Sequence, residues 1–204
     1  MNIKLHKGDL PAAYDPGVSV AIDTETLGLN PHRDRLCLVQ LSRGDGGADL
    51  VQIAPGQRRA PNLERLLADQ NVLKLFHFAR FDLATLGQTF GAIPAPVYCT
   101  KIASKLARTY TDRHGLKDLV RELLGFEISK QQQSSDWGAA TLTDPQLAYA
   151  ASDVLYLHEL KTRLDAMLAR EGRGEMAQAC FSFLPARARL DLAGWGEVDI
   201  FAHM

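Results

Sequence analysis

The first quarter of the chain alternates short apolar runs with polar turns. The turns contain the segments NPHRD and RGDGG, the second of which is rich in glycine. Short apolar runs separated by such turns are typical of a β-meander. We therefore predict three neighbouring strands, at residues 18–23, 36–41 and 49–53.

After this meander, the pattern predicts helices that alternate with single strands. The apolar period becomes helical over residues 61–68, and an apolar run at 72–78 indicates a buried strand. A helix at 80–90, a short strand at 97–99 and a helix at 100–109 follow. Such alternation favours a mixed sheet covered by helices. The predicted fold class is α/β, with a mixed five-stranded sheet that combines the antiparallel meander with parallel strands.

The second half of the chain is predicted to be mostly helical. Gly125 would end the first of these helices, and Thr143 with Pro145 supplies a capping residue and a first-turn proline for the next. The predicted helices are residues 116–124, 144–168 and 174–184.

Composition and charge restrict the class of protein. The 204 residues are 46% hydrophobic and 23% charged, which is typical of a globular protein, and the length suits a single domain over 1–204. The first ten residues lack the apolar segment of a secretory signal, and no run of about 18 apolar residues indicates a membrane helix. We therefore expect a cytoplasmic protein without a membrane partner. The net charge of −1 provides no global positive field, so any contact with nucleic acid must be local.

A pair of acids follows the first apolar run. Asp23 and Glu25 are two residues apart, so strand alternation places both carboxylates on one face. Two neighbouring carboxylates repel each other unless a cation neutralises them, which points to a hard divalent metal. Taken alone, such a pair is more often an ordinary acidic pair at the turn after a strand.

Two further acids and a tyrosine narrow the chemistry. Asp82 lies near the start of a predicted helix, and Asp153 lies among apolar residues of the long helix, where an unpaired carboxylate is costly. Tyr149 precedes Asp153 by four residues and so shares its helix face. An acidic pair, two later acids and this tyrosine together match a phosphodiesterase that uses two metal ions. We predict that Asp23, Glu25, Asp82 and Asp153 bind two Mg²⁺ or Mn²⁺ ions, with Tyr149 beside the attacking water.

Three segments resemble the exonuclease motifs of the DEDDy superfamily: DTET at 23–26, HFARFD at 77–82 and YAASD at 149–153. The resemblance implies an RNase H-like fold and 3′-5′ exonuclease activity. The segment SKQQQSSDWG at 129–138 is similar to the loop before the third motif of RNase D. A further RNA-binding domain of the HRDC type is not expected.

The chain more specifically resembles the nano-RNase C family of compact bacterial diribonucleases. The resemblance rests on residues 24–37, 99–117 and 129–137 and on the tail LDLAGWGEVDIFAH at 190–203. It implies hydrolysis of short single-stranded RNA, above all dinucleotides, in the last step of RNA decay. It also implies a ring-like homo-oligomer, expected to be an octamer.

The substrate-binding residues are assigned with alternatives. Leu29 either acts as an apolar wedge between two bases or packs in its turn, and His77 either contacts the 3′ sugar or is a core histidine. The basic residues between 101 and 117 either cap a 5′ phosphate or form a solvated helix face. Trp137 either orders the loop beside the site or anchors the core. The candidate substrate-binding residues are Thr24, Thr26, Leu27, Gly28, Leu29, His77, Phe81, Lys101, Arg108, Arg113, His114, Gln133 and Ser135.

Three other functions remain open from the sequence. The same acids would serve a broader exonuclease that trims longer RNA or single-stranded DNA. A nucleic-acid-binding module without catalysis is a second alternative, although all four acids and the tyrosine are present. A structural assembly subunit would explain the apolar tail, but it leaves the acids among apolar residues unexplained.

Overall fold

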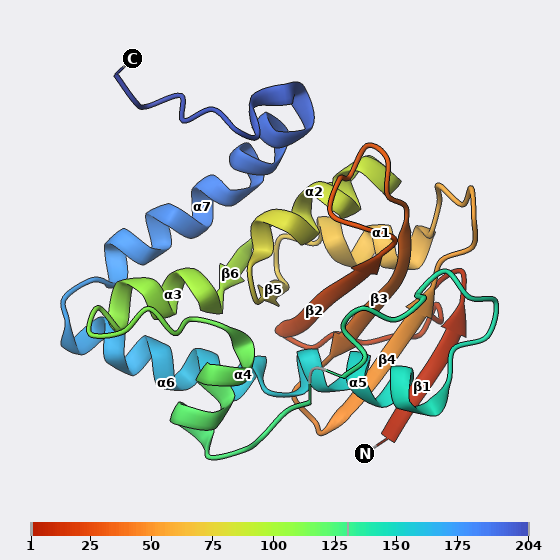
Figure 1. Ribbon diagram of the computed structural model, residues 1–204, viewed down its shortest axis with the longest axis horizontal. Coiled ribbons are helices and arrows are strands. Elements are labelled where there is room, and N and C mark those ends of the chain that lie inside the picture. Colours follow the sequence, from red (N-terminus) through yellow and green to blue (C-terminus); the bar gives the residue numbers. More distant parts are fainter. Residues whose placement is uncertain (1, 130, 204) are drawn as a thin grey trace.

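The computed structural model describes residues 2–129 and 131–203 and is built around a mixed six-stranded sheet (Figure 1). The strand order is β1-β4-β3-β2-β5-β6. Strands β2, β3 and β4 form the antiparallel meander, while β1, β5 and β6 join the sheet in parallel. The bounds are β1 (Asn2–Lys7), β2 (Ser19–Thr26), β3 (Leu36–Ser42), β4 (Gly47–Gln52), β5 (Leu73–Phe76) and β6 (Val97–Cys99). The predicted α/β class with a mixed sheet is confirmed.

The predicted count of five strands is wrong by one. Strand β1 pairs in parallel with β4 at the edge of the sheet, and most of its side chains are exposed. Its sequence NIKLHK has no apolar run, because an edge strand that buries little surface needs none. Its pairing with β4 includes an ion pair of 2.7 Å between His6 and Asp49.

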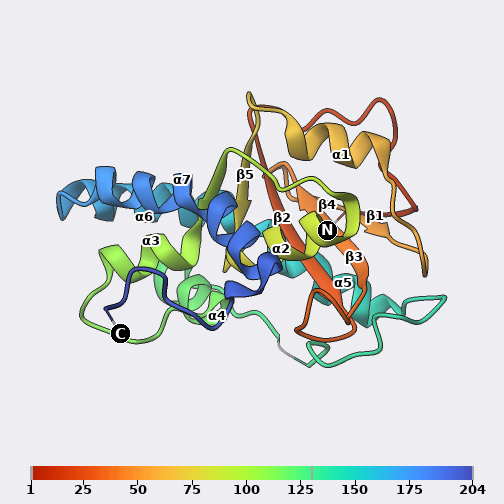
Figure 2. The ribbon, with the colours of Figure 1, turned by 90° about the horizontal axis from the view of Figure 1, so that it is seen from above.

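Helices cover the sheet and extend beside it. Helix α5 packs against β2, β3 and β4, and α2 packs against α7. Helices α3, α6 and α7 form a helical layer next to the sheet, as Figures 1 and 2 show. The helices are α1 (Pro61–Ala68), α2 (Ala79–Phe90), α3 (Thr100–Ala107), α4 (Leu116–Leu119), α5 (Asp144–Leu155), α6 (Leu157–Arg170) and α7 (Gly174–Leu190), with π-helical turns η1 (Val120–Leu124) and η2 (Asp191–Trp195).

The helix predicted over 144–168 is two helices in the structure. Its start is confirmed, because Thr143 and Gln146 form a reciprocal capping box. The chain breaks at Tyr156, whose ring stacks on Phe126 with centroids 5.6 Å apart. Neither glycine nor proline marks this break, so the sequence pattern does not predict it. The last helix also runs further than predicted, to Leu190.

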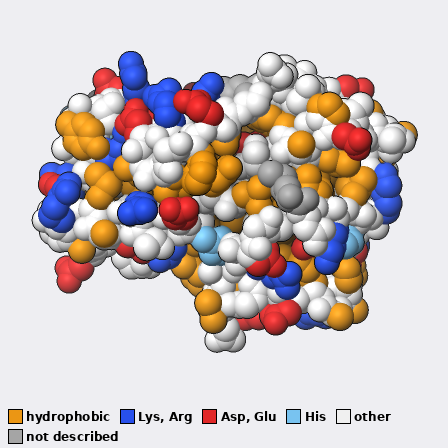
Figure 3. Space-filling model, turned by 90° about the horizontal axis from the view of Figure 1, so that it is seen from below, with side chains coloured by type: hydrophobic (Ala, Val, Ile, Leu, Met, Phe, Trp, Pro, Cys, Tyr) orange, Lys and Arg blue, Asp and Glu red, His pale blue; other side chains and the backbone are white. Residues whose placement is uncertain are grey.

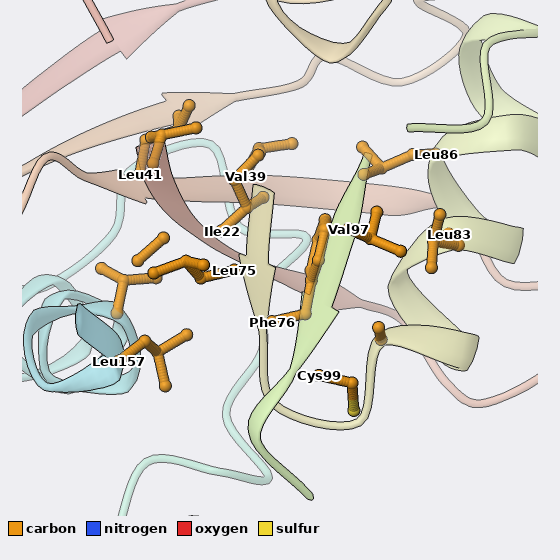
Figure 4. Packing of buried hydrophobic residues seen from close by; sticks show 14 of the residues in the cluster. Ile22, Val39, Leu41, Leu75, Phe76, Leu83, Leu86, Val97, Cys99 and Leu157 are labelled. Atoms are coloured by element: carbon orange, nitrogen blue, oxygen red, sulfur yellow. The ribbon is translucent and has the colours of Figure 1, made fainter. Parts of the chain in front are cut away.

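The core lies between the sheet and its helices. Leu83 and Leu86 of α2 lie beside the strand residues Val97 and Phe76, and Leu157 of α6 lies near Leu75 (Figure 4). All seven residues of β3 are buried, which agrees with a sheet covered on both faces. Among the described residues, no helix combines the length and apolar character needed to cross a bilayer.

Candidate active site

Three acids meet between β2 and α5. Asp23 and Glu25 lie on the same face of β2, and Asp153 comes from the helix that packs on that face. One carboxylate oxygen of each residue lies within 4.8 Å of those of the other two. Strand alternation and one turn of helix thus bring together side chains that are 130 positions apart in the chain.

Asp82 reaches the site from α2. It lies in the first turn of that helix, is 2% exposed, and its Oδ1 accepts a hydrogen bond of 2.7 Å from the Thr24 hydroxyl. Thr24 points to the face of β2 opposite Asp23 and Glu25, because successive side chains of a strand alternate. Asp82 nevertheless lines the same pocket as the other three acids.

Burial and mutual repulsion disfavour the ionised form of these acids. Burial, reinforced by the charges of Asp23, Asp153 and Asp82, raises the pKa of Glu25 to about 10. Burial also raises the pKa of Asp23, and burial together with Asp23 raises the pKa of Asp82. A hard divalent cation would instead lower the pKa of these carboxyl groups, because it favours the charged carboxylates. The donor set of oxygen atoms therefore fits Mg²⁺ or Mn²⁺.

Tyr149 lies one helical turn before Asp153 and lines the same pocket. Burial, followed by the charges of Asp153 and Glu25, raises the pKa of Tyr149, so the phenol is neutral in the metal-free protein. Its ring lies beside that of Trp137, with centroids 6.0 Å apart, and Trp137 is 2% exposed. Trp137 therefore anchors the loop before α5 in the core and also packs against the ring of Tyr149.

A pocket of about 320 Å³ opens onto the acids. Five of its lining residues agree with the substrate-binding prediction: Thr24, His77, Phe81, Lys101 and Gln133. Lys117 from the basic stretch also lines it. The residues that we did not anticipate are Phe78, Gly115, Leu116, Ile128 and Ser129. The adjacent Lys130 lies outside the described residues.

Phe78 has a strained backbone at the pocket. Its φ of 70° lies in the left-handed region, which is uncommon for an aromatic residue, and it caps the start of α2. The side chain is 47% exposed, and Lys101 Nζ lies 4.4 Å from the ring centroid. The position of Phe78 inside the HFARFD motif could have indicated that it lies at the site, but a positive φ cannot be predicted from the sequence.

His77 is held in one orientation. Its Nδ1 lies 2.9 Å from the Thr100 hydroxyl oxygen, and that hydroxyl donates a hydrogen bond of 3.2 Å to the Phe76 carbonyl. Because a carbonyl only accepts, the Thr100 oxygen accepts from Nδ1–H of His77. His77 is therefore held at the pocket wall by a hydrogen bond, and the structure does not make it a core histidine.

Residues 9–169 match the family described as 3′-5′ exonuclease. The chain belongs to this family. It is 39% identical to a ribonuclease D of Gluconacetobacter diazotrophicus over 84% of its own length and 44% of that protein. The chain thus spans less than half the length of the curated relatives that it matches.

Solved structures agree with this family. NrnC of Brucella melitensis with bound Mg²⁺ is 61% identical over the whole of both chains, with a TM-score of 0.96. The same Brucella protein bound to pGG is 62% identical over the whole of both chains, with a TM-score of 0.97. RNase D of Escherichia coli is 27% identical over 84% of this chain and 45% of that chain, with a TM-score of 0.76. The RNase H-like fold and the exonuclease family predicted from the sequence are confirmed, and the family is divalent-metal dependent.

Several residues that the sequence predicts to bind substrate do not line the pocket beside the acids. Leu29 is 83% exposed and does not pack in its turn; it lines a neighbouring pocket of about 490 Å³ that shares Phe78 and Phe81 with the first. Ser135 donates a hydrogen bond to Gln132. The predicted residues that line neither pocket are Thr26, Leu27, Gly28, Arg108, Arg113, His114 and Ser135.

The assignment of Arg108 to substrate binding is corrected by the structure. Arg108 is 0% exposed, forms an ion pair with Glu122, and donates a hydrogen bond of 2.8 Å to the Arg113 carbonyl. A charge pattern on a helix does not reveal which basic side chain folds inward. Arg108 therefore ties the end of α3 to the segment that precedes α4.

We expect Arg108→Met to destabilise the protein without weakening substrate binding. The substitution leaves the Arg113 carbonyl without its donor and leaves Glu122 with the contact to Arg121, which costs about 2 kcal/mol of unfolding free energy. Urea unfolding measures this loss, and the KM for a dinucleotide should stay within about twofold of wild type, on the scale where 1.4 kcal/mol is tenfold. A raised KM at unchanged stability would restore Arg108 as a substrate contact.

The stability of the metal-free protein should fall as pH rises. The folded state holds a proton on Glu25 up to about pH 10, whereas an ordinary glutamate has a pKa of 4.5, so unfolding releases protons between these values. The contribution of Glu25 to the free energy of unfolding is thus complete below pH 4.5 and is lost progressively toward pH 10. Thermal unfolding in EDTA from pH 5 to pH 9 tests this, and a flat profile would contradict the buried acid cluster. Added Mg²⁺ should oppose the loss, because metal binding requires deprotonated ligands.

Proposed function

We propose that this chain is a metal-dependent 3′-5′ exoribonuclease that hydrolyses short RNA, above all dinucleotides, to 5′-mononucleotides. The observation that supports this most strongly is the meeting of Asp23, Glu25 and Asp153 beside Tyr149 in one pocket. The likeness to NrnC bound to pGG, at 62% identity, supports the choice of a short substrate.

In this proposal, the four acids Asp23, Glu25, Asp82 and Asp153 hold two Mg²⁺ or Mn²⁺ ions. The ions supply Lewis-acid stabilisation of charge on the phosphate. Tyr149 holds the attacking water: its hydroxyl lies in the pocket beside Asp153 and offers an oxygen lone pair that accepts a hydrogen bond from the water. His77 and Phe81 contact the sugar and base, and Leu29 separates the two bases from its exposed turn.

The shape and charge of the site favour a short substrate over a long one. The two adjoining pockets of about 320 and 490 Å³ have the size of small-molecule sites. Lys101 and Lys117 supply local positive charge at the first pocket. On the face seen in Figure 3, lysine and arginine side chains are scattered among acidic and hydrophobic ones, without the continuous basic track that a long strand requires.

We also propose that the chain works in the cytoplasm as a homo-oligomer, expected to be an octamer. The supporting feature is the tail, where Trp195, Ile200 and Phe201 expose 49%, 43% and 75% of their surface. Apolar side chains gathered in this way mark contact surfaces. Light scattering of the full chain tests the assembly, and a monomer would contradict it.

Product analysis tests the proposed reaction. A 5′-phosphorylated RNA dinucleotide and oligonucleotides of increasing length are incubated with the protein in Mn²⁺ or in EDTA. We expect rapid conversion of the dinucleotide to mononucleotides in Mn²⁺ and slow attack on longer chains. Stepwise trimming of the long oligonucleotides at equal rates would favour the broader exonuclease. No hydrolysis of any length would favour a binding module.

A further inference from the structure

Gln40 is a buried polar residue to which the roles above give no function. It lies in the middle of β3 and pairs with Asp23 across the antiparallel β2–β3 ladder. Residues directly opposite each other in such a ladder project from the same face. The side chain is 0% exposed, and its Nε2 lies 3.5 Å from Asp23 Oδ2.

Packing alone does not explain this amide. Gln40 Oε1 is buried, and no hydrogen-bond partner for it exists among the described residues. A buried polar atom without a partner destabilises a fold, whereas an apolar side chain would fill the same space at no such cost. The neighbours Val39 and Leu41 are core residues of this kind (Figure 4). The feature of Gln40 that an apolar residue lacks is the donor aimed at Asp23.

A neutral donor suits this position better than a charged one. Among the described residues, no lysine or arginine forms an ion pair with Asp23 or Glu25. A cationic partner would occupy the carboxylate and repel a metal ion. An amide hydrogen bond restrains one oxygen, leaves the negative charge of the acid in place, and leaves the second oxygen available to a cation.

We propose that Gln40 is a positioning residue that orients the Asp23 carboxylate for a divalent cation. The inference rests on the proposed function, in which Asp23 is a metal ligand. The amide donates to Oδ2 and restrains rotation of the carboxylate, which leaves Oδ1 available to the cation. Groups that hydrogen-bond to a ligating carboxylate in this way typically change metal affinity by about 10–100-fold when they are removed.

The test uses Gln40→Met, which keeps the unbranched shape of the side chain and removes the donor. Mn²⁺ binding is measured by calorimetry, and thermal unfolding is measured in EDTA. We expect Mn²⁺ affinity to fall about 10–100-fold. The unfolding temperature in EDTA should stay equal or rise, because the unpartnered Oε1 is removed as well. A purely structural glutamine would not show this combination.

Ser42→Ala is the matched control. Ser42 lies two residues further along β3 on the same face, is 1% exposed, and donates a hydrogen bond of 2.7 Å to the Gly47 carbonyl. It pairs with Ala21 and so lies away from the acids. Its loss should lower the unfolding temperature in EDTA and leave Mn²⁺ affinity unchanged.

Two outcomes would overturn the role of Gln40. One is an unchanged Mn²⁺ affinity in Gln40→Met, and the other is a loss of affinity that accompanies an equal loss of stability in EDTA. Dinucleotide hydrolysis by the wild-type chain is measured in parallel. Failure of that hydrolysis counts against the proposed function, whereas the comparison of Mn²⁺ affinities still decides whether Gln40 positions Asp23.

Discussion

Asp153→Asn is expected to abolish turnover while the fold remains intact. The substitution removes one of three mutually close carboxylates and with it a charge that we propose to hold a divalent cation. Loss of Lewis-acid stabilisation is worth several kcal/mol, which corresponds to a fall in kcat of roughly a thousandfold or more. The metal-free variant should also unfold at a higher temperature than wild type, because one carboxylate of a mutually repulsive cluster is gone.

Asp144→Asn is the matched control for this variant. Asp144 begins the same helix α5, but it is exposed and lies outside both pockets. Its replacement should leave kcat unchanged and cost at most about 1 kcal/mol through the helix dipole. Steady-state kinetics and thermal unfolding of both variants are compared. Retention of wild-type kcat by Asp153→Asn would refute its role as a metal ligand.

Tyr149→Phe is expected to slow the chemical step far more than it weakens binding. The ring stays against Trp137, and only the hydroxyl that we propose to hold the water is lost. Removal of a positioned proton-transfer group lowers kcat by about 10²–10⁴-fold. KM and Mn²⁺ affinity should change little, because the acids are untouched.

Tyr156→Phe provides the corresponding control. Tyr156 lies at the C-terminal end of α5, stacks on Phe126, and does not line the active-site pocket. Its kcat should equal that of wild type. The hydroxyl of Tyr149 would lose its assigned role if the two variants had equal kcat, or if Tyr149→Phe raised KM and left kcat unchanged.

The parts of the fold that bury apolar surface were predictable from the sequence. The three strands of the meander and the start of α5 left clear patterns of apolar runs and capping residues. Strand β1 has no such pattern of apolar residues, because it is a polar edge strand that pairs with β4 far along the chain. The break at Tyr156, whose ring packs against Phe126, is likewise not marked by glycine or proline.

The candidate acids could be grouped from the sequence because their spacing has a local geometric meaning. Two residues in a strand and four residues in a helix each place side chains on one face, which linked Asp23 with Glu25 and Tyr149 with Asp153. Their convergence between β2 and α5 is a tertiary property, and only the motif order suggested it. The partnership of Asp82 with Thr24 was equally invisible, since it joins a strand and a helix 58 positions apart.

Two residues show why polar side chains are harder to interpret. The charge pattern predicts that Arg108 binds substrate, but its side chain at the end of α3 is buried and pairs with Glu122. Gln40 is not among the predicted site residues. An amide in the apolar, fully buried segment LCLVQLS is nevertheless a signal of a specific polar partner. In both cases the partner that gives the side chain its role is distant in sequence.

The central claim is that the acids of β2, α2 and α5 converge on a pair of divalent cations beside Tyr149. A crystal of the full chain soaked in Mn²⁺, with anomalous difference density measured at the manganese edge, tests this directly. We predict two peaks about 3.5–4 Å apart, contacted by Asp23, Glu25, Asp82 and Asp153. Manganese density away from these carboxylates, or its absence at the pocket in the presence of a bound dinucleotide, would contradict the claim.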